Sequence, residues 1–244
     1  MTAEGTQVPA RQPVMAGSVG VLGGTFDPIH LGHLAIADEV RETLGLERIL
    51  FVPAGIPPHK PDRMISSAAD RVGMVRLAIA DNPAFELSRL EVDRPGPSFA
   101  VETLAELTRA ARARGKGADL TFILSDEALA GFPEWRDPAR ILELARLAVV
   151  PRAFTGATAT GRRVWRIDDA WVGLHLPDGA ERVVFVEAPR IAISASDIRR
   201  RVASGRSIRY LVPPAVLAYI ADHRLYSGME DRGRLTESNA THAS

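Results

Sequence analysis

Apolar residues along this chain follow two alternating patterns, short continuous runs and longer stretches at helical spacing. Stretches with near-helical spacing predict helices over 31–44, 70–80 and 98–114, with Ser98 as the N-cap of the last. Continuous apolar runs of a few residues predict strands buried on both faces. These runs cover 19–22, 49–52, 120–124, 147–150 and 183–186, and a further strand is expected around 85–92, before the breaker Arg94–Pro97.

Strands that alternate with helices imply βαβ units and a parallel sheet. We therefore predict an α/β fold, a doubly wound, Rossmann-like parallel sheet with helices on both faces, formed by residues 18–226 as a single domain. Residues 1–17 and 227–244 lack periodicity and are typical of a disordered leader and a disordered tail. The stretch 151–179 is less regular, and the pattern assigns no role to it.

Composition excludes several classes of protein. Lys plus Arg and Asp plus Glu both number 30, so the chain lacks the basic excess typical of a protein that coats nucleic acid. It contains no cysteine, which excludes a disulfide scaffold, a Cys-ligated zinc site and thiol catalysis. No apolar run approaches the roughly 20 residues that span a bilayer. We expect a cytoplasmic protein without nucleic-acid or membrane partners, and leave open a homo-oligomer.

A glycine turn between the first predicted strand and the first predicted helix is a candidate phosphate site. Gly23 and Gly24 let the backbone approach an anion, and the helix start offers free N–H groups. His30 and His33, spaced i, i+3, project from one face and can each donate to a phosphate oxygen. A single histidine here would more often be a cap or a surface residue. A metal pair would need a third ligand that the sequence does not locate.

A second candidate anion site lies at a predicted helix start near the C-terminal end. Ser194, Ser196 and Asp197 place hydroxyl and N–H groups at the positive end of a helix dipole. Arg199, three residues after Ser196, can fold back over the same anion. The alternative is an ordinary N-cap followed by a basic solvated helix, because Arg200–Arg201 come next.

These two segments resemble a known family. The run Gly23–His33, Gly-Gly-Thr-Phe-Asp-Pro-Ile-His-Leu-Gly-His, resembles the signature of the nucleotidylyltransferase superfamily, in the form typical of bacterial nicotinate-nucleotide adenylyltransferases. The run Ile193–Arg199 is similar to the family element Ile-Ser-Ser-Thr-x-x-Arg, which closes on the triphosphate. The resemblance implies that the two histidines and the backbone from Gly23 to Phe26, including Thr25, contact the phosphates of ATP.

The same resemblance extends to the expected acceptor side. Pro57-Pro58-His59-Lys60 resembles a stretch of the nicotinate-nucleotide enzymes, and Arg71 occupies a position where that family keeps an arginine. The resemblance implies that His59, Lys60 and Arg71 contact the phosphate and ribose of a mononucleotide. A Pro-rich surface loop is the alternative interpretation of this tetrapeptide.

Two further segments resemble the family with substitutions. In Ser98–Leu104, Ala100 replaces a threonine whose hydroxyl helps recognise the pyridine carboxylate in relatives. In the run that begins at Phe122, Ser125 replaces a glycine and Glu127 replaces an aspartate on the wall that contacts nucleotide. Trp135 can stack on a pyridine ring or act as a hydrophobic plug.

The resemblance implies transfer of the adenylyl group of ATP to nicotinate mononucleotide, which yields nicotinic acid adenine dinucleotide and pyrophosphate. His30, His33 and Arg199 would neutralise the developing charge, with Mg²⁺ bridging the β- and γ-oxygens. The expected partners are ATP and a pyridine mononucleotide. Two alternatives stay open: the same reaction with another acceptor such as nicotinamide mononucleotide, or a weakly active paralogue that binds nucleotide.

Overall fold

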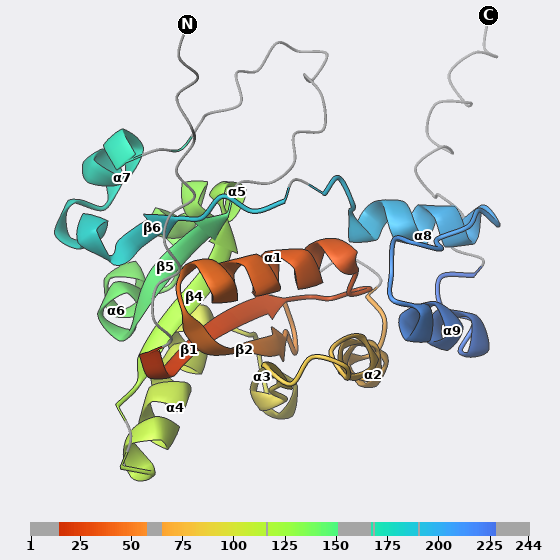
Figure 1. The fold of residues 1–244 in the computed structure, drawn as a ribbon, viewed down its shortest axis with the longest axis horizontal. Helices are drawn as coiled ribbons and strands as arrows, with labels where there is room; N and C mark the ends of the chain where they lie inside the picture. Colours follow the sequence, from red (N-terminus) through yellow and green to blue (C-terminus); the bar gives the residue numbers. More distant parts are fainter. Residues whose placement is uncertain are drawn as a thin grey trace, which may run out of the picture.

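The protein is built on a six-stranded parallel sheet with the strand order β3-β2-β1-β4-β5-β6 (Figure 1). The computed structural model describes residues 15–57, 65–115, 117–150, 167, 169–189 and 191–227. The strands are β1 (Met15–Gly24), β2 (Leu46–Pro53), β3 (Phe85–Leu87), β4 (Asp119–Ser125), β5 (Ala145–Val150) and β6 (Val183–Phe185).

Helices cover both faces of this sheet and enclose two hydrophobic cores. One core is shared with α1 (Leu31–Thr43), α2 (Ala68–Ala78), α8 (Ala195–Ala203) and α9 (Pro214–Asp222). The other is shared with α4 (Ala100–Ala113), α5 (Asp126–Ala130), α6 (Pro138–Leu144) and α7 (Asp169–His175). The predicted doubly wound α/β fold is therefore confirmed.

The burial of both faces of strand β4 explains why apolar and polar residues do not alternate in its sequence. Phe122 and Leu124 pack into the core under α4, whereas Ile123 between them packs into the core under α1. Successive side chains of a strand point to opposite faces, so burial of both faces requires a continuous apolar run.

Three expected boundaries were wrong. The predicted strand 85–92 is a three-residue strand followed by the short helix α3 (Leu90–Asp93). The helix expected to begin at Ser98 has Phe99 as its N-cap, and the Ser98 hydroxyl instead accepts a hydrogen bond from the Gly55 amide at 2.9 Å. Strand β1 begins at Met15, inside the segment predicted as a leader. Residues 1–14, 151–166 and 228–244 lie outside the described residues.

The centre of the sheet is where the chain changes direction. Strand β1 pairs with β2 on one side and with β4 on the other. The chain leaves β1 for α1 on one face and leaves β4 for α5 on the opposite face. Open α/β sheets bind ligands outside the carboxyl ends of the strands at such a switch point. Among the described residues, no helix is long and apolar enough to cross a membrane.

Candidate active site

The glycine turn at the end of β1 is held in place by Phe26. This residue has a positive φ of 50° and is 2% exposed. Its ring lies so close to Gly24 that a Cβ there would be 3.0 Å from Phe26 Cζ, which explains the glycine. Because the Phe26 side chain is buried, its expected contact with ATP can only be made by the main chain.

The two histidines lie together at the start of α1. His30 is the N-cap, and its ring stacks on that of His33 with centroids 3.7 Å apart and planes inclined by 24°. The edge of the His33 ring also packs against Phe26, at a centroid distance of 5.1 Å. The structure therefore brings the predicted pair together at the end of the glycine turn.

A main-chain hydrogen bond assigns the tautomer of His33. The His30 amide donates to His33 Nδ1 at 3.2 Å, so this nitrogen carries no proton. The proton of the neutral ring is then on Nε2, which makes Nε2 the donor atom of this ring. The helix start thus sets the orientation of His33 and also its donor atom.

The segment that leads into α8 passes over the first turn of α1. The carbonyl oxygen of Ile191 lies 3.9 Å from the position that a Cβ on Gly32 would occupy. Further along, Arg199 Nη1 donates to the main-chain oxygen of Asp27 at 2.6 Å, and Nη2 donates to Ser196 Oγ at 3.2 Å. The two anion sites predicted separately from the sequence are therefore parts of one site.

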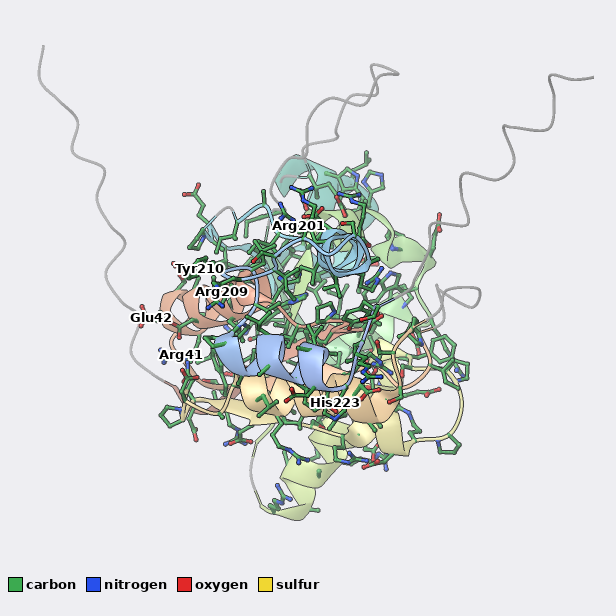
Figure 2. All side chains as sticks on the ribbon, turned by 90° about the vertical axis from the view of Figure 1, so that its right-hand side faces the viewer. Arg41, Glu42, Arg201, Arg209, Tyr210 and His223 are labelled. Carbon is green, nitrogen blue, oxygen red and sulfur yellow. The ribbon has the colours of Figure 1, made fainter. Side chains whose placement is uncertain are left out.

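Ser194 and Asp197 organise the start of α8. The Ser194 hydroxyl accepts from the Asp197 amide at 3.1 Å as the N-cap. The Asp197 carboxylate accepts from Arg200 at 2.5 Å and from Arg201 at 3.1 Å, and Arg201 is labelled in Figure 2. Burial opposes ionisation of Asp197, but the hydrogen bonds from Arg201 and Arg200 hold its pKa below the ordinary value. The Asp197 side chain thus contacts cations of its own helix.

Arg71 does not lie where a ligand contact would require. It is 2% exposed, and burial lowers its pKa while the Asp27 carboxylate opposes that shift. Its guanidinium donates to four main-chain carbonyl oxygens at 2.6–3.1 Å, those of Thr25, Ala54, Gly55 and Ser66. The expected contact with the acceptor is therefore corrected: Arg71 joins the glycine turn, the end of β2 and the start of α2 from behind.

The wall formed by α3 and the start of α4 is joined to the segment after β2. Ile56 forms a bridge with Pro97, and the Ser98 amide donates to the Ile56 oxygen at 2.9 Å. Gly55 packs so tightly here that a Cβ would lie 2.3 Å from the Glu91 carbonyl oxygen. This segment leads through Pro57 toward His59 and Lys60, which lie outside the described residues.

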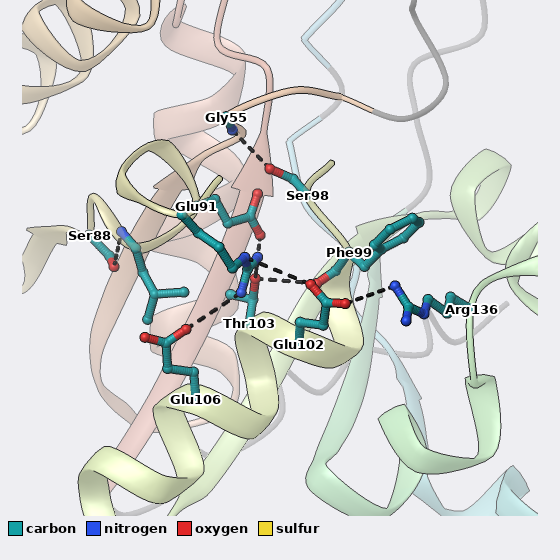
Figure 3. A network of polar contacts seen from close by, with 11 residues as sticks. Gly55, Ser88, Glu91, Ser98, Phe99, Glu102, Thr103, Glu106 and Arg136 are labelled. Atoms are coloured by element: carbon teal, nitrogen blue, oxygen red, sulfur yellow. Dashed lines mark hydrogen bonds and ion pairs between the residues drawn. The ribbon is translucent and has the colours of Figure 1, made fainter. Parts of the chain in front are cut away.

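A polar network, the acceptor-wall network, extends along this wall (Figure 3). The Thr103 hydroxyl donates to the buried Glu91 carboxylate at 2.7 Å and accepts from Arg94 at 2.9 Å. Glu102 accepts from Arg136 at 2.8 Å, and the Arg136 guanidinium carbon lies 4.7 Å from the centroid of the Phe99 ring. We define the network as Glu91, Arg94, Phe99, Glu102, Thr103, Glu106 and Arg136.

The remaining predicted residues surround this wall. Ala100 is the first residue of α4, directly after Phe99. Trp135 is partly buried and packs against Phe122 and Phe132 at centroid distances of 6.1 and 5.5 Å. These contacts support the interpretation of Trp135 as a hydrophobic plug, because the indole packs against the two phenylalanine rings. Glu127 is exposed in the first turn of α5, directly beyond the end of β4.

Sequence reasoning missed Tyr226, which bonds to Asp27, and Arg136, which belongs to the acceptor-wall network. The Asp27 carboxylate is buried and accepts from the Tyr226 hydroxyl at 2.7 Å, a pair separated by 199 positions. No short-range pattern could have joined them. Arg136 was also missed, although it directly follows the predicted Trp135.

The described residues contain no group of three or more His, Asp or Glu side chains that could hold a metal ion. Mg²⁺ prefers to keep waters and phosphate oxygens as ligands and needs few protein ligands. A divalent ion that enters with a nucleotide triphosphate therefore fits this site.

Comparison with known proteins agrees with this geometry. Residues 21–201 match the cytidylyltransferase-like family. The chain is 48% identical to a probable nicotinate-nucleotide adenylyltransferase of Roseiflexus sp. (strain RS-1) over 85% of this chain and 97% of the relative. It is 44% identical to one of Thermomicrobium roseum over 87% of this chain and 92% of that relative.

The fold is also similar to that of solved structures. One is the Plasmodium falciparum nicotinic acid mononucleotide adenylyltransferase complexed with NaAD, with a TM-score of 0.67 and 16% identity over 86% of this chain and 97% of that chain. At this identity the likeness concerns the fold alone. The family match and the two relatives above show that the chain belongs to the nicotinate-nucleotide adenylyltransferases, which are nucleotidyltransferases of the cytidylyltransferase-like family.

Proposed function

We propose that this protein transfers the adenylyl group of ATP to nicotinate mononucleotide, which forms nicotinic acid adenine dinucleotide and releases pyrophosphate. One observation carries the proposal: His30, His33 and Arg199 come together at the glycine turn on the carboxyl side of the sheet. This arrangement offers cationic and neutral N–H donors to an extended polyphosphate.

The reaction needs no general base and no covalent intermediate. A phosphate oxygen of the mononucleotide attacks the α-phosphorus of ATP, and a new P–O bond forms. The bond from the α-phosphorus to the α–β bridging oxygen breaks, and pyrophosphate leaves with the electron pair. Catalysis is then positioning together with neutralisation of the charge that develops on the leaving group.

Each residue at the turn has a separate part in this step. His33 donates from Nε2 to a phosphate oxygen, because its Nδ1 is occupied by the His30 amide. Arg199 neutralises the β- and γ-phosphates. Its guanidinium donates to Ser196 in the first turn of α8, and the N-cap Ser194 fixes the start of this helix. A divalent ion such as Mg²⁺ would enter with ATP, held by its phosphates, and would supply further neutralisation of the leaving group.

A second acceptor, nicotinamide mononucleotide, is favoured by one observation. Ala100, at the start of α4, has no hydroxyl to offer a pyridine carboxylate. Purified protein given ATP, Mg²⁺ and either mononucleotide should release pyrophosphate at least about tenfold faster with nicotinate mononucleotide, a difference of about 1.4 kcal/mol. Faster release with nicotinamide mononucleotide would show that this mononucleotide is the acceptor. No release of pyrophosphate with either mononucleotide would favour a protein that binds nucleotide without transferring the adenylyl group.

A further inference from the structure

The buried Asp27 carboxylate takes no part in the reaction described above. Its side chain is 4% exposed. One oxygen accepts from the Tyr226 hydroxyl at 2.7 Å, and the other accepts from the Ser66 amide at 3.4 Å. Asp27 therefore joins the phosphate-binding turn to the start of α2 and to the segment after α9.

Arg199 lies close to this carboxylate without bonding to it directly. Its Nη1 is 3.9 Å from Asp27 Oδ2, which is too long for a hydrogen bond. The same nitrogen donates instead to the main-chain oxygen of Asp27, and Nη2 donates to Ser196. These two bonds use two of the five N–H donors of a guanidinium. The main chain, and not the carboxylate, therefore sets the orientation of Arg199.

Tyr226 is the strongest neutral partner of the carboxylate. Burial, and then the neighbouring Asp27 charge, raise the pKa of Tyr226 far above its ordinary value. The hydroxyl therefore keeps its proton at any pH at which the enzyme works, and it donates to the carboxylate. A buried carboxylate that loses a hydrogen-bond donor pairs with another donor or cation nearby, because an unsatisfied buried charge is costly. Among the described residues, Arg199 is the cation that lies 3.9 Å from this carboxylate, whereas the buried Arg71 is held by four main-chain oxygens.

We propose that Tyr226 is a positioning residue for the phosphate site: it satisfies Asp27 and thereby keeps Arg199 from turning onto that carboxylate. The guanidinium then stays directed toward the triphosphate. This rests on the proposed function, because it assumes that Arg199 meets the phosphates of ATP. Tyr226 itself touches no substrate in this scheme.

The test is Tyr226→Phe, which removes one oxygen atom. We expect KM for ATP to rise about tenfold, the size of effect typical of a lost hydrogen bond to a charged group, while KM for the mononucleotide stays within about twofold. Tyr219→Phe is a matched control, because Tyr219 also donates to a carboxylate, that of Asp70 at 3.1 Å, without contacting the phosphate-binding turn. Equal KM values for ATP in the two variants would overturn the proposal.

A double-mutant cycle separates positioning from a general loss of stability. If Tyr226 acts through Arg199, then Tyr226→Phe should change KM for ATP less than about twofold in an Arg199→Met background, which has no cation to turn onto Asp27. A full tenfold effect in that background would show that Tyr226 acts by another route and would contradict the proposal. Urea midpoints of the single variants identify any part of the effect that comes from unfolding.

Binding of an ATP analogue separates this proposal from the proposed function. Calorimetry with an analogue that carries a methylene group between the α- and β-phosphates needs no turnover. We expect a Kd about tenfold weaker for Tyr226→Phe than for Tyr219→Phe. If the wild-type protein binds the analogue but releases no pyrophosphate, the proposed function fails and the Kd ratio still decides the role of Tyr226. A wild-type protein that does not bind the analogue would contradict both.

Discussion

The phosphate site and the acceptor-wall network hold their arginines in opposite ways. At the phosphate site, Arg71 and Arg199 donate to main-chain carbonyl oxygens and are largely buried. In the acceptor-wall network, Arg94 and Arg136 are paired with side-chain carboxylates, and the Arg136 side chain is 58% exposed. One region is fixed by main-chain acceptors, the other by pairs between side chains that extend from the buried Glu91 to the exposed Arg136.

This difference indicates which contacts depend on the fold and which depend on particular side chains. Main-chain acceptors are present whatever the neighbouring side chains are, so the phosphate site depends on the fold itself. Exposed ion pairs contribute little to stability and depend on two side chains at once. They can be exchanged at low cost, which suits a wall that we propose selects the acceptor. The following variants test this contrast, from the largest expected effect to the smallest.

The largest effect should come from His33→Ala at the phosphate site. Loss of one donor that stabilises developing charge typically lowers turnover about 10²-fold or more. We expect this fall in kcat without a loss of folding, measured by pyrophosphate release and by circular dichroism. His175→Ala in α7 is the control, since this exposed ring contacts only α7 in its described contacts. Near-normal turnover of His33→Ala would remove His33 from the mechanism.

Arg71→Met should show how much the buried contacts of Arg71 contribute to the stability of the same region. The substitution keeps much of the side-chain volume but leaves four buried carbonyl oxygens without their donor. We expect a loss of about 2–3 kcal/mol in the free energy of unfolding, which urea titration measures. Arg76→Met, on the exposed side of α2, should stay within about 0.5 kcal/mol of the wild type. Equal losses in the two variants would show that the carbonyl contacts of Arg71 are unimportant.

Arg136→Ala should have the smallest effect and should act on the acceptor alone. It removes a partly exposed ion pair with Glu102 and a cation placed over Phe99, each worth at most about 1 kcal/mol. We expect KM for the mononucleotide to rise about threefold, with kcat and KM for ATP unchanged. Arg140→Ala, which breaks a surface pair in the nearby α6, is the control. A larger effect on ATP than on the mononucleotide would contradict the division into two regions.

Local features of the phosphate site could be predicted from the sequence. The glycines, both histidines and the start of α1 fall within a run of eleven residues, so neighbouring positions determine their geometry. The parallel sheet was also predictable, because strands buried on both faces leave continuous apolar runs. The stretch Phe85–Val92 was predicted as one strand, whereas it holds a three-residue strand and the start of a short helix, because scattered apolar residues over eight positions do not distinguish a strand from a helix.

Long-range contacts could not be predicted in this way. Arg71 was expected to meet a ligand, because it occupies a position where the resembling family keeps an arginine, but an arginine is almost never buried unless its charge is paired or its donors are satisfied. Here the donors are satisfied by carbonyl oxygens from three separate segments, which only the folded chain brings together. Ser98 shows the same limit, since its hydroxyl bonds to Gly55, 43 positions away, and does not cap its own helix.

The bond between Asp27 and Tyr226 has a consequence for how the protein is made. The two residues are 199 positions apart, so the turn that contains Asp27 is synthesised well before its tyrosine partner. Chains leave the ribosome from the N-terminus at roughly 5–20 residues per second. For about 10–40 seconds of synthesis, a nascent chain therefore carries its nucleotide loop without the tyrosine that completes it. The Asp27 carboxylate gains its tyrosine partner only after synthesis has passed Tyr226.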